Sequence, residues 1–461
     1  MSLPWSTITQ DETTRAVVQE GLLTRAIHDP LFPRLLFRAE TPFERWAANI
    51  GDEQVFTVSG LMKKRGRRRQ PGVDPDSDTY GFEQYKAMLG RYDGSADIHH
   101  PSEVRAIINR MMQKAAILGA QAGQTLDSQV RNRQYAAAMS GNTYATLAGV
   151  ATLSVKVACL YGFHEMRQSG KVKYTAPSAT NPIPVTIGAA TARNVVGFAQ
   201  DNPEPEGIYG PGTLTLDAVA TFSLNDRVLA ADGSPIYRAG GGSPIHALTA
   251  SDKITLSLIR QAVAELRANN VPTHDDGFYH VHLDPTSESQ LYDDSEWRNI
   301  HTAAYDSMAY RDLVIGVKLG CVFYRNNECP RTGTVQAVGA AGFDIDDAFP
   351  GGPAVLTNAT GIPVHRALVT GKESCYEKFS DPDLLVSEAG ITGKTGWFDI
   401  NLNNISVITD RVKFIWRAPL NKTQDESSMT WLLDADWAIR TDSLTGTAAR
   451  YKRTRTIEHA G

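Results

Sequence analysis

Two histidines and an aspartate lie close together in FYHVHLDPTSESQL, residues 278–291. His280 and His282 are two positions apart on a predicted strand, so their side chains project from the same face. Two imidazoles on one face can share a metal ion, and Asp284 could add an oxygen ligand. One hypothesis for the chain is therefore a zinc-dependent hydrolase that uses His280, His282 and Asp284.

The same stretch also has a purely structural interpretation, which we favour. The metallo-β-lactamase pattern HxHxDH ends in a histidine, whereas this chain has Pro285 there, and proline cannot ligate a metal through its side chain. In this interpretation Tyr279, Val281 and Leu283 face a core and the histidines face a polar surface. It predicts no metal, no cofactor and no catalytic residue.

Two further motifs are incomplete. GITGKT at 390–395 is similar to a phosphate-binding loop, but Glu388 stands where the pattern needs its first glycine. DPDSDT at 74–79 is similar to the start of a calcium loop, but Thr79 replaces the turn glycine and Tyr85 replaces the closing glutamate. Neither motif predicts a binding site. Catalytic triads assembled from distant residues stay open, because sequence spacing cannot exclude them.

A basic run, KKRGRRR, lies in a polar segment of about 16 residues, longer than most structureless loops in compact domains. Its cations could contact nucleic-acid phosphates, dock on an acidic patch of a neighbouring copy, or be merely solvated. The acids that follow favour docking between copies, because a phosphate reader would repel its target there. The predicted interface residues are Lys63, Lys64, Arg65, Arg67, Arg68, Arg69, Asp74, Asp76 and Asp78.

The whole chain has the composition of a globular protein. It has 461 residues, of which 42% are hydrophobic and 21% charged, and a formal net charge of -5. That charge argues against a dedicated nucleic-acid binder. Four cysteines without a CxxC pair predict reduced thiols in a cytosolic compartment. We also expect no secretion signal and no membrane-spanning segment.

The elements that must position these residues follow from apolar spacing. Residues 11–47 predict a loosely helical arm, broken by prolines, that must lie against another surface. Residues 53–60 and 79–89 predict two strands of a hairpin with the basic run at its tip. Apolar residues recur at helical spacing from Val104 to Val130, so we predict a long helix over 102–138, capped by Ser102.

The second half of the chain predicts a mixture of strands and helices. Residues 145–248 are rich in glycine, proline and threonine and predict β structure. Thr249 with Asp252 predicts the cap of a second helix, which Asn269 and Asn270 can end. A strand over the histidines and a short helix near 295–308 follow. The stretches RVKFIWRAPL and SMTWLLDADWAIRT predict two strands of one sheet.

This order resembles the major capsid (coat) protein of tailed double-stranded DNA bacteriophages, which has the Hong Kong ninety-seven-type capsid fold. The closest resemblance lies in TASDKITLSLIRQAVAELRANNVPTHDDGFYHVHLDPTSESQLYDDSEWRNI, residues 249–300. YRDLVIGVKLGCVFYRNNECP resembles the glycine-punctuated strand turn of that family, and HRALVTGKESCYEKF resembles a later strand that ends at a glycine.

The resemblance implies an α+β fold with an N-terminal arm, an E-loop hairpin, a long spine helix, a peripheral domain and an axial domain. We expect the arm at 1–50, the hairpin at 51–98, and the spine helix with the start of the peripheral domain at 99–164. A β-rich insertion is expected at 165–245 and the axial domain at 246–340. Residues 341–461 would supply the remaining sheet of the axial and peripheral domains and the C-terminus.

The resemblance also implies a structural, non-enzymatic function. Many copies would assemble into pentamers and hexamers of an icosahedral shell around double-stranded DNA, with only nonspecific proximity to the DNA. Scaffolding and portal proteins, and a decoration protein, are the implied partners, with no membrane. The implied location is the virion capsid, assembled in host cytoplasm. A zinc-dependent hydrolase and an adaptor that binds DNA through the basic loop stay as alternatives.

Overall fold

The structure is a computed structural model of the chain, which forms two compact units. Unit 1 comprises Met1–Glu53, Met88–Gln129 and Glu377–Asp436, and unit 2 comprises Gln54–Ala87, Val130–Tyr376 and Trp437–Gly461. The residues that the structure describes are 36–46, 51, 53–59, 72, 74, 77, 82–99, 110–164, 167–168, 171–172, 176–188, 191–201, 207–224, 226–231, 233–234, 236–240, 248–298, 317–326, 328–329, 331–332, 364–380, 405–409, 411–417, 426–440 and 453–461.

Unit 1 is built on a six-stranded sheet of order β1-β19-β22-β21-β20, with β4 paired to β22. Side chains of β22 alternate between buried and half-buried over much of its length, as expected of a strand with one covered face. The prediction that the two C-terminal stretches are strands of one sheet is confirmed by β21 and β22, which pair antiparallel. The strands are β1 (Phe43–Arg45), β4 (Gly90–His99), β19 (Cys375–Phe379), β20 (Ile405–Thr409), β21 (Val412–Arg417) and β22 (Glu426–Ile439).

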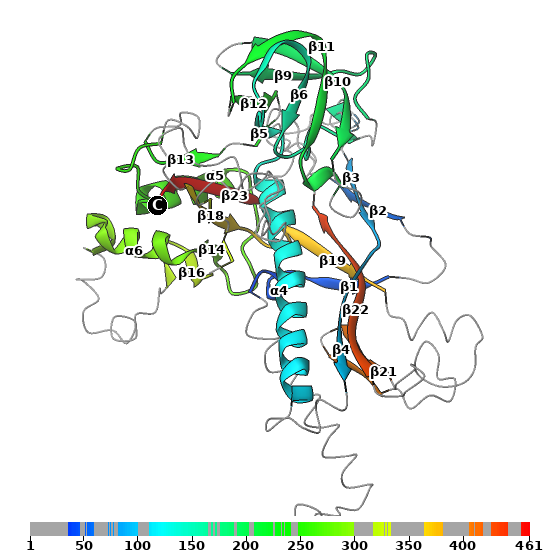
Figure 1. Ribbon diagram of the computed structural model, residues 1–461. Helices are drawn as coiled ribbons and strands as arrows, with labels where there is room; N and C mark the ends of the chain where they lie inside the picture. Colours follow the sequence, from blue (N-terminus) through cyan, green and yellow to red (C-terminus); the bar gives the residue numbers. More distant parts are fainter. Residues whose placement is uncertain are drawn as a thin grey trace, which may run out of the picture. The chain divides into compact units, whose positions relative to one another are not determined.

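The long helix is α4 (Arg110–Ala138), whose 29 residues span about 44 Å at 1.5 Å per residue. Ala115, Leu118, Ala122 and Leu126 recur every three or four positions and are all buried. In unit 1 the first part of α4 runs beside β4, and Lys114 Nζ donates to the Asp97 carbonyl at 2.7 Å (Figure 1). A long helix ending at Ala138 is confirmed, whereas Ser102 and the predicted first turns lie outside the described residues.

The described part of the N-terminal arm belongs to the body of unit 1. It contains α2 (Leu36–Ala39) and β1, which pairs in parallel with β19. Arg38 is buried and holds Glu377 through two hydrogen bonds of 2.8 Å, while its backbone N–H donates to Asp127 at 3.0 Å. Residues 36–46 of the predicted arm thus rest on their own chain, and residues 11–35 lie outside the described residues.

The predicted hairpin is present in unit 2 as β2 (Glu53–Ser59) and β3 (Phe82–Met88), which form a two-stranded sheet. Phe56 stacks on Tyr85, with ring centroids 4.9 Å apart, and lies 6.3 Å from Tyr376. The chain then continues into β4. Strand β4 (Gly90–His99) belongs to the unit 1 sheet, although we predicted residues 51–98 as the hairpin region.

The β structure predicted for 145–248 is a barrel of six antiparallel strands, drawn in green tones (Figure 1). The order is β5-β12-β9-β10-β11-β6, and bonds from Thr146 N to Lys156 O and from Ala158 N to Tyr144 O close the sheet near its first and last strands. Its buried residues form one apolar cluster. The strands are β5 (Asn142–Tyr144), β6 (Gly149–Val157), β9 (Ile183–Ile187), β10 (Thr191–Gln200), β11 (Gly212–Phe222) and β12 (Arg227–Ala230), with β7 (Arg167–Gln168), β8 (Lys171–Val172) and η3 (Gly207–Tyr209) in its connections.

The rest of unit 2 is a seven-stranded mixed sheet of order β13-β23-β18-β14-β16-β15, with β17 paired to β18. A second apolar cluster joins it to helices α5 (Leu256–Ala268) and α6 (Pro285–Asp293). The strands are β13 (Tyr237–Arg238), β14 (Tyr279–Leu283), β15 (Val317–Lys318), β16 (Cys321–Arg325), β17 (Arg331–Thr332), β18 (Val364–Thr370) and β23 (Thr454–Ala460).

The predicted start of the second helix is wrong. Thr249 and Asp252 do hydrogen-bond as expected, but they close a turn, and α5 begins at Leu256 with Thr255 as its N-cap. The backbone between them is held by other elements, because the Asp252 carbonyl accepts from Ala460 and the Leu256 N–H donates to Asp294. The predicted end is confirmed, since Asn269 is the C-cap and Asn270 has φ +54°.

All four cysteines lie among the described residues, and each is a buried free thiol, which confirms that they form no disulfide framework. Burial raises the pKa of the Cys159 and Cys321 thiols to about 12 and about 11, respectively. Such thiols are poor nucleophiles at neutral pH. Within the described part of the chain, no helix is long and apolar enough to cross a bilayer.

Candidate functional site

Strand β14 carries the histidine motif and is an interior strand of the unit 2 sheet. It lies between β16, to which it pairs in parallel, and β18, to which it pairs antiparallel. All five of its residues are buried, with His282 at 0% exposure and His280 at 7%. Both faces of the strand are thus covered, so the expectation that the histidines face a polar surface is wrong.

His280 is held by neighbours from the turn before its own strand. Its Nε2 lies 2.8 Å from Asp276 Oδ2, and its ring stacks on His274 with centroids 3.8 Å apart. The ring also meets Tyr324 edge-on at 4.9 Å. The hydrogen bonds of Asp276, although opposed by partial burial, lower the pKa of that carboxyl. A charged aspartate therefore orients the His280 imidazole.

His282 and Asp284 have separate partners. The His282 ring stacks on Tyr324 with centroids 5.7 Å apart, and its Nδ1 lies 3.4 Å from Asn326 Nδ2. Asp284 is the N-cap of α6, where it accepts from the Ser287 N–H at 3.2 Å, and its other oxygen lies 2.5 Å from His365 Nδ1. The carboxylate is therefore saturated by a helix cap and a different histidine.

The zinc hypothesis does not fit this arrangement. Among the residues that the structure describes, the ligand atoms of His280, His282 and Asp284 do not gather within 4.8 Å of one another, as a shared metal would require. Each also has the hydrogen-bond or ring partner given above. The geometry supports the structural interpretation of the motif, although with buried rather than surface histidines.

A Ser–His–Asp network lies at the end of the same strand, and sequence reasoning missed it. Ser287 Oγ lies 2.7 Å from His459 Nε2 and donates to Asp284, while Asp284 pairs with His365, whose ring lies over that of His459. In a catalytic triad one histidine bridges the serine and the aspartate. Here Ser287 pairs with His459 and Asp284 pairs with His365, so no single histidine bridges the serine and the aspartate. Ser287 is also fully buried.

Burial controls the charges of this network. Burial alone would raise the pKa of Asp284, but hydrogen bonds from His365 and Ser287 together lower it to about 2. Burial lowers the pKa of His459 to about 4, against weaker opposing contributions from the Ala460 carbonyl and Asp284. At neutral pH the network therefore holds a charged aspartate and a neutral His459. Its effect is to tie β14, α6, β18 and β23 together.

A second buried cluster lies on the same sheet. Glu458 receives Arg238 Nε at 2.6 Å and Arg366 Nε at 3.0 Å, and its exposure is 0%. Burial would raise the pKa of Glu458, but the two guanidinium groups outweigh it and lower the pKa. Removing one partner of such a buried group is costly, because a charge would be left uncompensated. The cluster therefore stabilises one specific packing of β13, β18 and β23.

No signal in the sequence could have paired these groups by spacing, because Ser287 and His459 are 172 positions apart. The N-cap of α6 at Asp284, in contrast, could be predicted from the sequence. Asp284 followed by Pro285 and by Glu288 in the first turn is a typical helix start. Helix α6 therefore begins directly after β14, earlier than the short helix predicted near residue 295. Residues 295–298 are also helical, and residues 299–308 lie outside the described residues.

The predicted interface at the hairpin tip lies almost wholly outside the described residues. This applies to all six cations of the basic run and to Asp76 and Asp78, while Asp74 is described and exposed. GITGKT at 390–395 also lies outside the described part of the chain. The structure therefore neither brings the tip residues together nor separates them, and their role stays a prediction.

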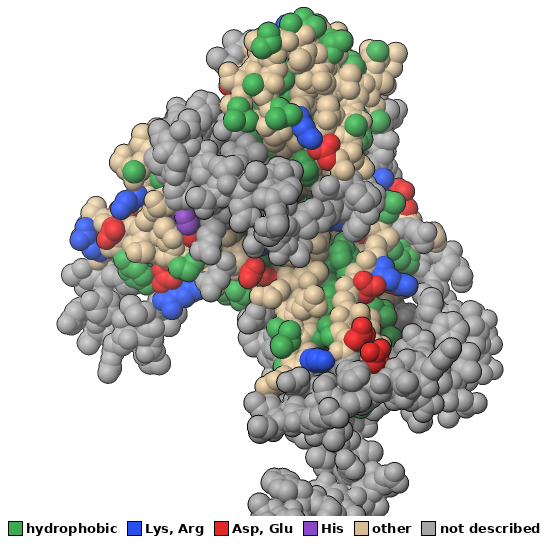
Figure 2. All heavy atoms as spheres, viewed as in Figure 1, with side chains coloured by type: hydrophobic (Ala, Val, Ile, Leu, Met, Phe, Trp, Pro, Cys, Tyr) green, Lys and Arg blue, Asp and Glu red, His purple; other side chains and the backbone are tan. Residues whose placement is uncertain are grey.

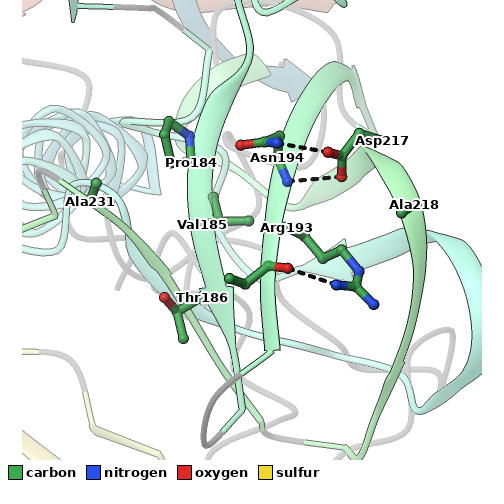
Figure 3. Close-up of a pocket in the computed structure, with 9 residues that line it drawn as sticks. Pro184, Val185, Thr186, Arg193, Asn194, Asp217, Ala218 and Ala231 are labelled. Atoms are coloured by element: carbon green, nitrogen blue, oxygen red, sulfur yellow. Dashed lines mark hydrogen bonds between the residues drawn. The ribbon is translucent and has the colours of Figure 1, made fainter.

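A shallow pocket of about 270 Å³ opens on the barrel wall formed by β9, β10 and β11 (Figure 3). Asn194 donates to both carboxylate oxygens of Asp217, at 3.0 and 2.7 Å, and these bonds lower the pKa of Asp217. Arg193 donates to the carbonyls of Ala192 and Val219. The polar groups of the pocket thus brace adjacent strands.

By sequence, no protein-family model and no curated protein matches the chain. By structure, it is similar to the capsid of Ralstonia phage GP4, with 13% sequence identity, a TM-score of 0.47, and coverage of 92% of this chain and 90% of that one. It is also similar to the capsid of cyanophage P-SCSP1u, with 12% sequence identity, a TM-score of 0.45, and coverage of 93% of this chain and 88% of that one. A third similar structure is the capsid of cyanophage Pam1, with 10% sequence identity, a TM-score of 0.46, and coverage of 94% of this chain and 92% of that one. All three are phage capsid structures, and the similarity to each extends over about nine-tenths of this chain.

Proposed function

We propose that the chain is a structural subunit that self-assembles into pentamers and hexamers and forms the icosahedral capsid shell of a bacteriophage around double-stranded DNA. The observation that carries this proposal is the hairpin of unit 2. Among the described strands, β2 and β3 pair only with each other, and they connect through the polar segment with the basic run.

An isolated two-stranded ribbon is only marginally stable in water. Among the described residues of this hairpin, Phe56 packs against Tyr85 and Tyr376, while Val55 on the same strand is 46% exposed. A neighbouring copy would cover the exposed side and stabilise the hairpin. Large permanent interfaces of this kind typically exceed roughly 2,000 Å². The hairpin is therefore suited to reach across a subunit boundary.

The described side chains favour a structural role over an enzymatic one. The histidine motif is buried, the serine of the Ser–His–Asp network is fully buried, and the described thiols are buried. The structures to which the chain is similar are phage capsids, which is the class of protein that we propose. It carries the expected partners with it: other copies of the chain, scaffolding and portal proteins, and a decoration protein, in a virion capsid assembled in host cytoplasm.

Assembly of the purified full chain tests the proposal directly. We expect sedimentation velocity and negative-stain electron microscopy to show closed particles or capsomer rings at micromolar concentration. A compact monomer at high concentration under all assembly conditions tried would contradict it. Near-stoichiometric zinc that is lost in His280→Ala would point to the hydrolase instead.

The basic run gives a sharper prediction. Replacing Lys63, Lys64, Arg65, Arg67, Arg68 and Arg69 with serine should reduce particle yield on the order of tenfold or more, because several charge-assisted contacts between copies are lost together. Far-UV circular dichroism should show that the subunits stay folded.

The matched control exchanges lysine for arginine and arginine for lysine at the same six positions, which preserves the charge. We expect this control to assemble. Normal particle yield from the serine variant would contradict the docking role of the basic run. Salt-sensitive DNA binding that only the serine variant loses would instead assign the run to nucleic acid.

A further inference from the structure

The connection between strands β10 and β11 of the barrel is longer than their pairing requires. Strand β10 ends at Gln200 and β11 begins at Gly212, so residues 201–211 separate two antiparallel neighbours. Hairpin connections commonly need only about two to five residues. The last part of this connection contains the single-turn helix η3, and we name residues 207–211 the strut. The extra length allows the strut to reach a segment outside the barrel.

The strut meets the last turns of α4 through the aromatic ring of Tyr209. The guanidinium carbon of Arg133 lies 3.4 Å from the centre of that ring. Tyr161 also stacks on the ring, with centroids 4.9 Å apart and an angle of 19° between the planes. Arg133 is only 3% exposed, and a cation is attracted more strongly to an aromatic face when it is desolvated. The Tyr209 ring therefore links the strut to α4.

Apolar and backbone contacts support the same junction. Ile208 and Tyr209 pack against a buried cluster that joins α4 to the barrel and to the last residue of β22: Ala136, Ala137, Cys159, Tyr161 and Ile439. The Leu160 N–H donates to the Gly210 carbonyl at 3.1 Å. Figure 2 shows few charged side chains on the visible face of the barrel, which agrees with a junction made mainly by apolar and aromatic groups. The strut is thus built onto α4.

The barrel is also attached where its chain enters and leaves. The Ser234 N–H donates to the Ser140 carbonyl at 2.7 Å, and Asn142 Nδ2 donates to the Ser234 carbonyl at 2.9 Å. Tyr144, two positions further along β5, packs in a buried cluster with Val364 of β18. We name this region, residues 140–144 with Ser234, the pivot. The pivot holds the barrel to the rest of unit 2 at one place.

We propose that the strut is a releasable lock that fixes the angle of the barrel on α4. Arg133 lies five positions before the end of α4 at Ala138, about 8 Å along the helix axis. Attachment at the pivot alone leaves rotation possible, whereas a second attachment at that distance prevents it. The lock can open, because η3 is a single turn and Tyr209 is half-buried, and segments with few buried contacts open locally at low free energy. The barrel is then presented at one angle when locked and at several when released.

Distances between a spin label on the barrel and one on α5 test the lock in unassembled subunits of the full chain. Thr186 of β9 and Gln261 of α5 are exposed, and the four native cysteines are buried, so labels select the thiols of Thr186→Cys and Gln261→Cys. Pulsed electron paramagnetic resonance should give one narrow distance distribution for this doubly labelled parent. Tyr209→Ala should broaden it, with the released population rising on the order of tenfold, because both ring contacts are lost.

Three further variants show which group carries the lock. Tyr209→Phe keeps the ring and should keep the narrow distribution. Arg133→Met keeps most of the side-chain volume but removes the cation, so it should broaden the distribution less than Tyr209→Ala. The matched control is Leu224→Ala, which removes a 54% exposed apolar side chain from the connection between β11 and β12 and should change nothing. Circular dichroism should show that all variants are folded.

The outcomes decide for or against the lock without any assembly step. A distribution in Tyr209→Ala as narrow as in the parent overturns it, and so does a broad distribution in the parent itself. Equal broadening in Tyr209→Phe and Tyr209→Ala would show that the ring does not carry the contact. If Tyr209→Ala fails to fold, Arg133→Met decides, and a narrow distribution there overturns the lock. Because the subunits are unassembled, a negative result leaves the proposed shell function standing.

Discussion

At the scale of single residues, unit 2 is stabilised by buried polar side chains that hydrogen-bond one another. Asp284, Ser287, His365 and His459 satisfy one another. Unpaired buried polar groups are costly, so such a network disfavours packings in which the four elements are displaced. The same burial makes the network sensitive to pH.

We predict that acid destabilises unassembled subunits in two steps. The pKa of folded His459 is about 4 against an ordinary value of 6.5, so the unfolded chain binds more protons below pH 6.5. Stability should fall by about 3 kcal/mol as pH drops from roughly 6.5 to 4. Asp284, with a pKa of about 2 against 3.8, contributes stability that is lost only below about pH 4.

His459→Gln tests the upper window, because glutamine can still hydrogen-bond Ser287 but does not titrate. The free energy of unfolding, measured in urea between pH 7.5 and 4.5, should vary less with pH in the variant than in the wild type. A further measurement between about pH 4 and pH 2 should still show the loss of stability that Asp284 sets. An unchanged pH dependence between 6.5 and 4.5 would contradict the assignment to His459.

At the scale of elements, close backbone approach decides which residues are allowed at turns. Gly162 follows the barrel strand β6 and has φ +88°, and a Cβ there would lie 2.2 Å from the Gly141 backbone N. Gly277, before β14, has φ +84° with nothing within 4 Å of a Cβ. Both glycines have a positive φ, but only Gly277 has room for a Cβ atom.

We predict that Gly162→Ala is much more destabilising than Gly277→Ala. The control Gly277→Ala carries only the conformational cost of a left-handed L-residue, about 1–2 kcal/mol. Gly162→Ala adds a collision with backbone that cannot move aside, so the total loss should be about 4 kcal/mol or more. Thermal unfolding of both variants measures the difference, and equal losses would show that the turn at Gly162 can rearrange.

At the scale of the whole molecule, the two units are interwoven along the sequence. The chain crosses between them at residues 53/54, 87/88, 129/130, 376/377 and 436/437, which is five times. Neither unit is therefore complete until late segments are present. Strand β23 is the clearest case, because it is buried at all seven positions and lies between β13 and β18.

We predict that deleting residues 454–461 prevents unit 2 from folding. The deletion removes a central strand, the Ile457 contact in the apolar cluster, and Glu458, which compensates two buried arginines. Limited proteolysis and circular dichroism should show loss of protected structure. The control Ile457→Val should fold, with a loss of about 0.5–1.5 kcal/mol. Protection of unit 2 from proteolysis in the truncated chain, equal to that in the full chain, would contradict the prediction.

The sequence by itself determined the elements with strong local signals. The apolar repeat of α4, the paired strands β2 and β3, the β-rich character of 145–248 and the pairing of β21 with β22 were all predictable, because side-chain period and turn residues act locally. The N-cap at Asp284 was readable in the same way. The implied domain boundaries and hairpin-tip interface stay predictions.

Only the tertiary structure decided what the histidines face, which strands become neighbours, and where α5 begins. His280 and His282 are buried because β14 became an interior strand. Thr249 does not start a helix because β23 and α6 hold the following backbone. Ser287 meets His459 across 172 positions. The physical reason is common to all three: these environments come from segments distant in sequence, and local propensities contribute too little energy to decide against such packing.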